Sequence, residues 1–314
     1  KLFIQYGMLS DEKFYDRSLK FALLKDTDKK FFTFDEYKTL IKDNQTDKEN
    51  QLVYIYTNST EEQYSYIQAA KDKGYNVLLM DGQLDVHIVG HLEQKFEKTH
   101  FVRVDSDTID NIVRKGDSQK VDLNEDQRNA LQEVFKSQMP RIDKAEFNVT
   151  FEALGETANP ILLTQSEYMR RMREISALQP GMSFYGEIPD SFNITLNADH
   201  PLIKKVLFEE EAACSEQLAP ILAEIKGWEA RLSDLEEKQS KRKDDDISTA
   251  EQEDLDNTNS KLDSLRSQRD EILAGFAGSN SLVHELIDLA LLSNGMLKGE
   301  ALSRFIKRSV QMIG

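Results

Sequence analysis

The stretch LVYIYTNSTEEQYSYIQAAKDKGYNVLLMD, residues 52–81, decides the fold. It opens with a β-branched and aromatic run, continues with apolar residues at helical spacing as far as Gly74, and closes with a second apolar run. This order predicts a strand, a helix capped at its C-terminus by Gly74, and a second strand. Two short apolar strands joined by an amphipathic helix are typical of a right-handed parallel crossover.

The neighbouring sequence extends this unit in both directions. LDVHIVGHLEQKF (84–96) has the spacing of a second helix, and HFVRVD (100–105) that of a third strand. Residues 1–50 are helical in pattern, with a helix expected near 34–42. We therefore predict an α/β fold over residues 1–115: a small parallel βαβαβ layer covered by helices, ending at a polar linker.

Residues 116–314 are expected to form a second, α+β and mainly helical domain. Asp199 is the expected N-cap of a helix that has Pro201 in its first turn. The pattern further predicts helices over 126–138, 165–176, 281–293 and 298–313, extended chain over 145–151, and a strand that precedes the Asp199 cap.

Composition excludes several classes of protein. The 314 residues carry 40 Lys+Arg against 56 Asp+Glu, a net charge of −16, which argues against binding nucleic acid or an anionic membrane surface. No run approaches the roughly 20 apolar residues of a membrane-spanning helix. The single cysteine, Cys214, excludes an internal disulfide and favours the reducing cytoplasm.

Most of the acid excess lies in one window. Residues 209–272 hold 19 Asp/Glu and 9 Lys/Arg, a net charge of −10. Within this window apolar residues recur at alternating steps of three and four, on either side of a charged stretch: Leu218, Ile221, Ile225, Trp228, Leu232 and Leu235, then Leu255, Leu262, Leu265 and Ile272. The pattern predicts an antiparallel coiled-coil hairpin inserted at about 212–275, with two ordinary amphipathic helices on a core as the alternative.

Catalytic and metal motifs are absent from the sequence. It has no G-x-G-x-x-G, no phosphate-binding G-x-x-x-x-G-K-[ST], no G-x-S-x-G and no H-E-x-x-H. His87 and His91 have the i, i+4 spacing of two metal ligands, but no cysteine lies near them, so we interpret them as ordinary histidines. We interpret Asp81-Gly82 as a turn and not as a ligand-binding site. We predict no catalytic residues, no metal site and no bound cofactor.

Two helices carry apolar faces whose role the pattern leaves open. In QSEYMRRMREISALQ (165–179), Met169, Met172 and Ile175 share a face with Tyr168 beside them, either as a core stripe or as an adaptable contact surface. The last two helices could pack on their own domain or form a symmetric four-helix interface. Their apolar residues include Leu286, Leu289, Leu292, Leu302, Phe305, Ile306, Val310 and Ile313.

Six separated segments carry a resemblance to a known family. In chain order they are YGMLSDEKF (6–14), FFTFDEYKTLIKDNQ (31–45), LVYIYTN (52–58), NVLLMDGQLDVHIV (76–89), NITLNADHPLIKKV (193–206) and LALLSNGMLKGEALSRFIKRSVQMI (289–313). The first four resemble the middle domain of the ninety-kilodalton heat-shock chaperone family, and the last two its C-terminal domain. The bacterial branch is the nearest.

The resemblance implies a cytoplasmic chaperone fragment: the later part of the middle domain plus the C-terminal dimerisation domain. It implies client contact by Tyr168, Met169 and Met172, with Ile175 on the same face, and a homodimer built by the last two helices. It implies ATP and magnesium for the intact protein only, because the ATPase domain is missing. The acidic tail EEVD that recruits co-chaperones is also missing. The family gives the hairpin no role. A small-molecule-binding α/β enzyme and a coiled-coil scaffold remain as alternatives.

Overall fold

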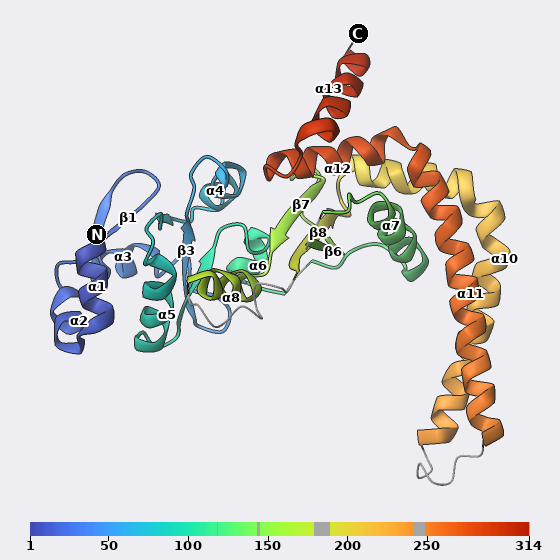
Figure 1. Ribbon diagram of the computed structural model, residues 1–314, viewed down its shortest axis with the longest axis horizontal. Helices are drawn as coiled ribbons and strands as arrows, with labels where there is room; N and C mark the ends of the chain where they lie inside the picture. The colour runs from blue at the N-terminus through green and yellow to red at the C-terminus, as the bar shows by residue number, and fades with distance from the viewer. Residues whose placement is uncertain (118, 143–144, 179–188, 241–248, 314) are drawn as a thin grey trace.

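The computed structural model describes residues 1–117, 119–142, 145–178, 189–240 and 249–313. Figure 1 shows an elongated molecule with the N-terminal α/β unit at one end, a mixed sheet in the middle and a long helical hairpin at the other end. None of its described helices is long and apolar enough to cross a membrane.

The parallel layer is confirmed. Strands β3 (Leu52–Thr57), β4 (Val77–Leu79) and β5 (Thr99–Arg103) form a sheet in the order β4-β3-β5, and both pairs are parallel. The crossovers are α4 (Tyr64–Asp72) and α5 (Asp85–Lys95), and the short α6 (Ile109–Ile112) follows β5. Gly74 has a φ of +76°, as its predicted capping role after α4 requires.

The first 50 residues are less helical than predicted. Helices α1 (Leu2–Ser10), α2 (Glu12–Ser18) and α3 (Phe34–Ile41) are present, but β1 (Leu23–Lys25) and β2 (Phe31–Thr33) form an antiparallel pair between α2 and α3. The Asp26 carboxylate accepts hydrogen bonds from the backbone N–H groups of Asp28 and Lys30, each at 2.9 Å. This local side-chain bonding builds the turn that the periodicity did not reveal.

The second unit is built on a mixed sheet. Strands β6 (Ala145–Glu152), β8 (Asp190–Asn197) and β7 (Ile161–Gln165) lie in the order β6-β8-β7, with β6 parallel and β7 antiparallel to β8. The sequence pattern did not predict β7. Helix α7 (Glu125–Ser137) begins with a capping box, and α8 (Glu167–Leu178) follows β7 directly.

Helix α10 (Pro201–Ser240) begins one residue later than expected. The backbone N–H of Leu202 donates to Nδ1 of His200 at 3.1 Å, so His200 is the capping residue. The prediction of Asp199 as the cap is wrong, because its carboxylate instead accepts from the N–H of Gly155 at 2.9 Å. Pro201 opens the first turn as predicted.

The predicted hairpin consists of α10 and α11 (Thr249–Ser279), packed side by side and antiparallel (Figure 1). Ile225, Leu262 and Leu265 are buried between them. The hairpin is not separate from the domain, because α10 starts inside the main core with Ile203 and Val206 and continues to the tip without a break. The charged tip, 241–248, lies outside the described residues.

Helices α12 (Ser281–Ser293) and α13 (Gly299–Ile313) end the chain close to the predicted positions. The turn between them has Gly295 at a φ of +64°. Figure 1 shows α13 pointing away from the body, with the C-terminus at its tip. The division into domains at residues 115 and 116 stays a prediction.

Candidate functional site

Helix α8 is attached to the α/β layer by its arginines. Arg170 is 5% exposed, and its Nη2 lies 2.7 Å from Oε1 of Glu167 and 2.6 Å from the hydroxyl of Tyr56 on β3. Its Nη1 lies 2.5 Å from Glu174, one turn further along α8. A fully ionised side chain is thus buried where α8 meets the parallel sheet.

Arg171 makes the second attachment. Its Nη1 lies 2.6 Å from Oε2 of Glu93 on α5, its Nη2 donates to the backbone carbonyl of Phe101 on β5, and its Nε lies 2.5 Å from Glu167. These ion pairs were not predicted from the sequence, although the spacing of Glu167, Arg170, Arg171 and Glu174 could have indicated pairs within one helix. That spacing carried no signal for Tyr56 or Glu93, which come from other elements.

Glu167 is the centre of this cluster. Its carboxylate accepts from Tyr56 at 2.8 Å and from the N–H of Arg103 at 3.1 Å, in addition to both arginines. Burial acts to raise the pKa of Glu167, but the charges of Arg170 and Arg171 outweigh it and hold the pKa below its ordinary value. Burial raises the pKa of Tyr56 well above its ordinary range, with the charge of Glu167 as a further cause. The cluster is therefore ionised at Glu167 and neutral at Tyr56 near pH 7.

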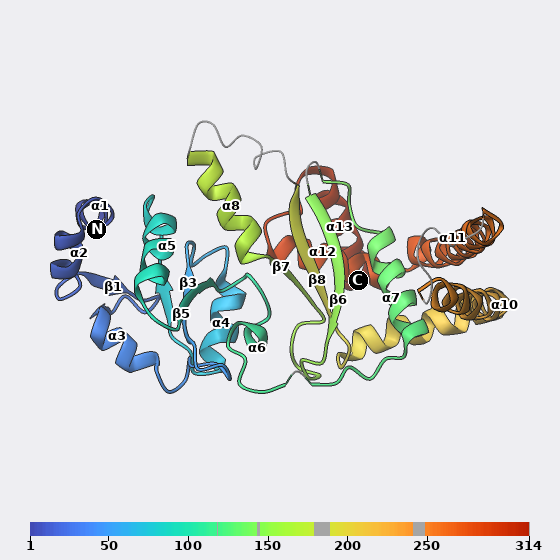
Figure 2. The ribbon, with the colours of Figure 1, turned by 90° about the horizontal axis from the view of Figure 1, so that it is seen from below.

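The apolar face of α8 is not used in this attachment. Tyr168 is 69% exposed, and Met169, Met172 and Ile175 are half-buried. None of these four side chains belongs to the hydrophobic clusters found in the described part of the chain. Figure 2 shows α8 between the α/β layer and the mixed sheet. We call these four residues the α8 stripe. Whether this face is a core stripe or a contact surface stays a prediction.

The residues predicted for the dimer interface divide into two groups. Leu286 and Phe305 are buried in the protomer's own core, and Leu302 packs partly buried against it. Leu289, Leu292, Ile306 and Val310 are 39% to 63% exposed. The side chain of Ile313 lies outside the described residues. The exposed four, which we call the terminal patch, are those available to a second molecule.

Ion pairs set the position of α13 against α12. Nε of Arg308 lies 2.7 Å from Oε1 of Glu285, and its Nη2 pairs with Asp288. Glu285 is 7% exposed. Two partners on one face of α12 therefore hold Arg308 and the helix that carries it.

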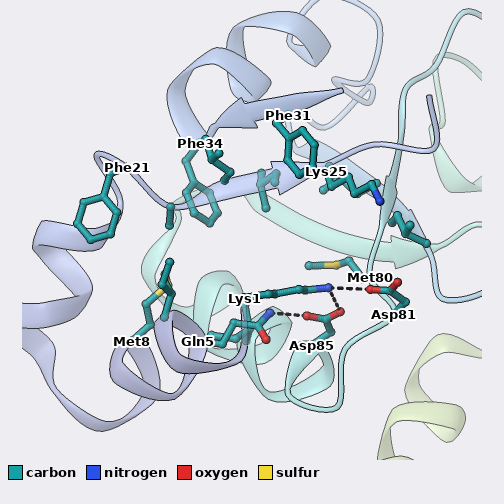
Figure 3. Close-up of a pocket in the computed structure, with 17 residues that line it drawn as sticks. Lys1, Gln5, Met8, Phe21, Lys25, Phe31, Phe34, Met80, Asp81 and Asp85 are labelled. Atoms are coloured by element: carbon teal, nitrogen blue, oxygen red, sulfur yellow. Dashed lines mark hydrogen bonds and ion pairs between the residues drawn. The ribbon is translucent and has the colours of Figure 1, made fainter. Parts of the chain in front are cut away.

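A cavity of about 490 Å³ lies between α1, the β1–β2 pair and the start of α5 (Figure 3). Its walls are mainly apolar, and its polar end is formed by Lys1, whose Nζ lies 2.6 Å from Asp85 and 3.2 Å from Asp81. A second hollow of about 430 Å³ lies at the carboxyl ends of β3 and β4 and includes Asn58 and Arg170. Asp81 borders both.

His87 and His91, the two histidines of α5, are both half-buried. The ring of His91 packs edge-on against Tyr15, with 4.9 Å between ring centroids. Across the described ranges, no three His, Cys, Asp or Glu side chains are grouped to hold a metal ion.

Comparison with known proteins gives consistent matches. The profile described as "Hsp90 protein" matches residues 3–225. "Chaperone protein htpG" of Bacteroides fragilis (strain 638R) is 56% identical over 313 residues, which is 100% of this chain and 46% of that protein. "Chaperone protein HtpG" of Porphyromonas gingivalis (strain ATCC 33277) is 50% identical over 316 residues, again 100% and 46%. "Endoplasmin homolog" of Dictyostelium discoideum is 26% identical over 73% of this chain and 30% of its own length. The chain thus spans about half the length of its bacterial relatives.

Proposed function

The chain belongs to the Hsp90 protein family, and on that basis we propose that it is the part of an HtpG-type chaperone that contacts partly folded client proteins and joins two protomers. The whole protein would act in the cytoplasm and use ATP with magnesium. We propose that its nucleotide is bound by the part of the molecule that this chain does not span.

One observation carries the client proposal. Helix α8 is attached through buried arginines, and the α8 stripe occupies other positions of the helix, with Tyr168 exposed and the other three side chains half-buried. Two of the four are methionines, whose flexible and polarizable side chains adapt to apolar partners of different shape. A helix that is attached by charge and keeps part of its apolar face accessible at Tyr168 suits the capture of varied clients.

The client proposal is tested with Met169→Glu plus Met172→Glu. We expect the double variant to lose several-fold in suppression of aggregation of a thermally unfolded client, with an unchanged circular dichroism spectrum. The matched control is Leu40→Glu plus Tyr64→Glu, which charges two side chains that are 49% and 61% exposed on other helices. Unchanged suppression in the Met169/Met172 variant, or an equal loss in the control, would contradict the proposal.

The dimer proposal rests on the terminal patch, where four large apolar side chains on two adjacent helices are exposed. Light scattering should give about twice the chain mass of 36.1 kDa. Ile306→Asp plus Val310→Asp should give a monomer, because burying two new carboxylates is unfavourable. Ser303→Asp plus Lys307→Asp, exposed positions of α13, is the control. A parent that is monomeric at micromolar concentration would refute the dimer.

A second candidate function is small-molecule binding, which the hollow at the carboxyl ends of β3 and β4 favours. Calorimetry with a panel of nucleotides tests it. Saturable binding that Asn58→Trp abolishes would favour this function over the chaperone proposal.

A further inference from the structure

Helix α10 contains a proline far from either end. Pro220 has no N–H, so the carbonyl of Glu216 lacks its usual hydrogen-bond donor one turn later, and a proline here bends the helix. In Figure 1, α10 leaves the core in one direction and turns into the hairpin in another, and α11 turns alongside it. We define the arm as the described hairpin residues after Pro220 on α10 and before Ile272 on α11, 221–240 and 249–271.

The apolar packing between the two helices divides at the same level. Leu218 and Leu273 belong to the main core, whereas Ile225, Leu262 and Leu265 form a separate cluster inside the arm. On α11, Leu265 and Ile272 are separated by Arg-Ser-Gln-Arg-Asp-Glu, residues 266–271. Arg269 there pairs with its neighbour Asp270 at 2.7 Å. The arm therefore has its own small core, which meets the main core at its base, where Leu222 still packs against the domain.

An exposed ion pair joins the arm to α7. Nζ of Lys226 lies 2.7 Å from Oδ2 of Asp126, and the two side chains are 64% and 38% exposed. An exposed pair of this kind is weak and is screened by salt. It can favour one direction of the arm without locking it.

We propose that the hairpin is an arm that pivots at Pro220 and is held in its present direction by the Lys226–Asp126 pair. Three features occur together near Pro220. The helix lacks a backbone hydrogen bond, the apolar packing divides into two clusters, and the ion pair beyond this point is weak. The inference is independent of the proposed function, since it uses neither the α8 stripe nor the terminal patch.

Distance measurements between spin labels test the pivot. One label is placed on α7 by Lys136→Cys and one on the arm by Glu236→Cys, in a Cys214→Ala background. The parent should give a distribution with a main distance that broadens in 1 M salt, where charges are screened within about 3 Å. Lys226→Gln should broaden it at low salt, shifting the populations up to about fivefold, as expected of an exposed ion pair. Pro220→Ala should narrow the distribution and move its mean, because the helix regains its hydrogen bond.

Two controls separate pivoting from general loosening. Arg266→Gln removes an equally exposed pair with Glu229, 2.8 Å long but internal to the arm, and should change nothing. A label at Ala212→Cys, on α10 before the bend, should keep a fixed distance to α7 under every condition. The proposal is overturned if the distance between the labels at positions 136 and 236 is unchanged by salt, by Lys226→Gln and by Pro220→Ala. It is also overturned if the distance between the labels at positions 136 and 212 changes as much.

Discussion

Replacing Glu167 by Gln keeps the shape of the side chain and removes one charge from the cluster that holds α8. The cluster contains three arginines and four carboxylates: Arg103, Arg170, Arg171, Glu93, Asp105, Glu167 and Glu174. The variant leaves three charges of each sign, so the cluster changes from a net charge of −1 to a balanced set. Locally, Arg170 and Arg171 both lose a carboxylate at hydrogen-bond distance.

The loss of stability depends on the ion-pair partners that Arg170 and Arg171 keep in the variant. Removing one partner of a fully buried ion pair costs about 3–5 kcal/mol. Arg170 keeps Glu174 and Arg171 keeps Glu93, so we expect a smaller loss of about 2–3 kcal/mol in the stability of the α8 attachment. At 1.4 kcal/mol per tenfold change, protection of the α8 amides from hydrogen exchange should fall roughly 30- to 150-fold.

The pH dependence gives an independent check. The folded-state pKa of Glu167 lies below its ordinary value of 4.5. Its contribution to stability is therefore complete above pH 4.5 and is lost as the pH falls through the folded-state pKa. The difference between parent and Glu167→Gln should thus be constant from pH 5 upward and shrink in acid.

Hydrogen exchange followed by mass spectrometry measures this opening locally, which matters because a molecule of this size need not unfold in one step. Glu224→Gln is the matched control: its carboxylate lies 3.7 Å from Lys261 on the exposed surface of the hairpin. The reasoning would be refuted if α8 exchanged equally in the parent and in Glu167→Gln, or if Glu224→Gln exposed α8 to the same extent.

Three further predictions concern stability. Burial, with the charge of Glu211 as a second cause, raises the pKa of Glu210 from 4.5 to about 7, so stability should fall as the pH rises between these values. In urea unfolding, Glu210→Gln should be more stable than the parent by about 1–2 kcal/mol above pH 7 and equally stable below pH 4.5. Tyr66→Phe removes a buried hydroxyl that donates to the carbonyl of Leu163 and lies 3.0 Å from Asn294. The variant should lose about 1–2 kcal/mol of stability and show faster hydrogen exchange at the α12–α13 turn. Unchanged exchange there would contradict the idea that Tyr66 holds this turn through Asn294. Gly295→Ala, at a φ of +64°, should lower stability by about 1 kcal/mol in thermal unfolding, and an equally stable variant would show that the turn does not need glycine.

Periodicity predicted the elements that depend on local pattern. The three parallel strands, the crossover helices and the final two helices occur where apolar spacing placed them, because burial of one face requires that spacing in the sequence. The β1–β2 pair was missed because its turn is built by the Asp26 carboxylate and its strands have three residues each. The cap of α10 was misassigned because His200, rarely favoured at that position, accepts the hydrogen bond.

The sequence predicted which residues share a helix face in the candidate surfaces, but not what each face contacts. Tyr168, Met169, Met172 and Ile175 could be identified as one helix face, but a face pattern does not say whether that face points to a core or to solvent. Arg170, which is buried against Tyr56, shows which face of α8 is attached, and the role of the apolar face stays a prediction. In the same way, the apolar residues of α12 and α13 form one set in sequence and divide into core and exposed groups only in the folded protomer.

The sequence by itself determined the parallel layer, the paired hairpin helices, the concentration of acidic charge in the hairpin window and the similarity to a chaperone family. Each of these features depends on which residue types lie close together in the sequence. Only the tertiary structure decided which face of α8 is attached, which residues of the last two helices are covered, and that the hairpin begins inside the core. These depend on contacts between residues tens to hundreds of positions apart, and such contacts leave no local period in the chain.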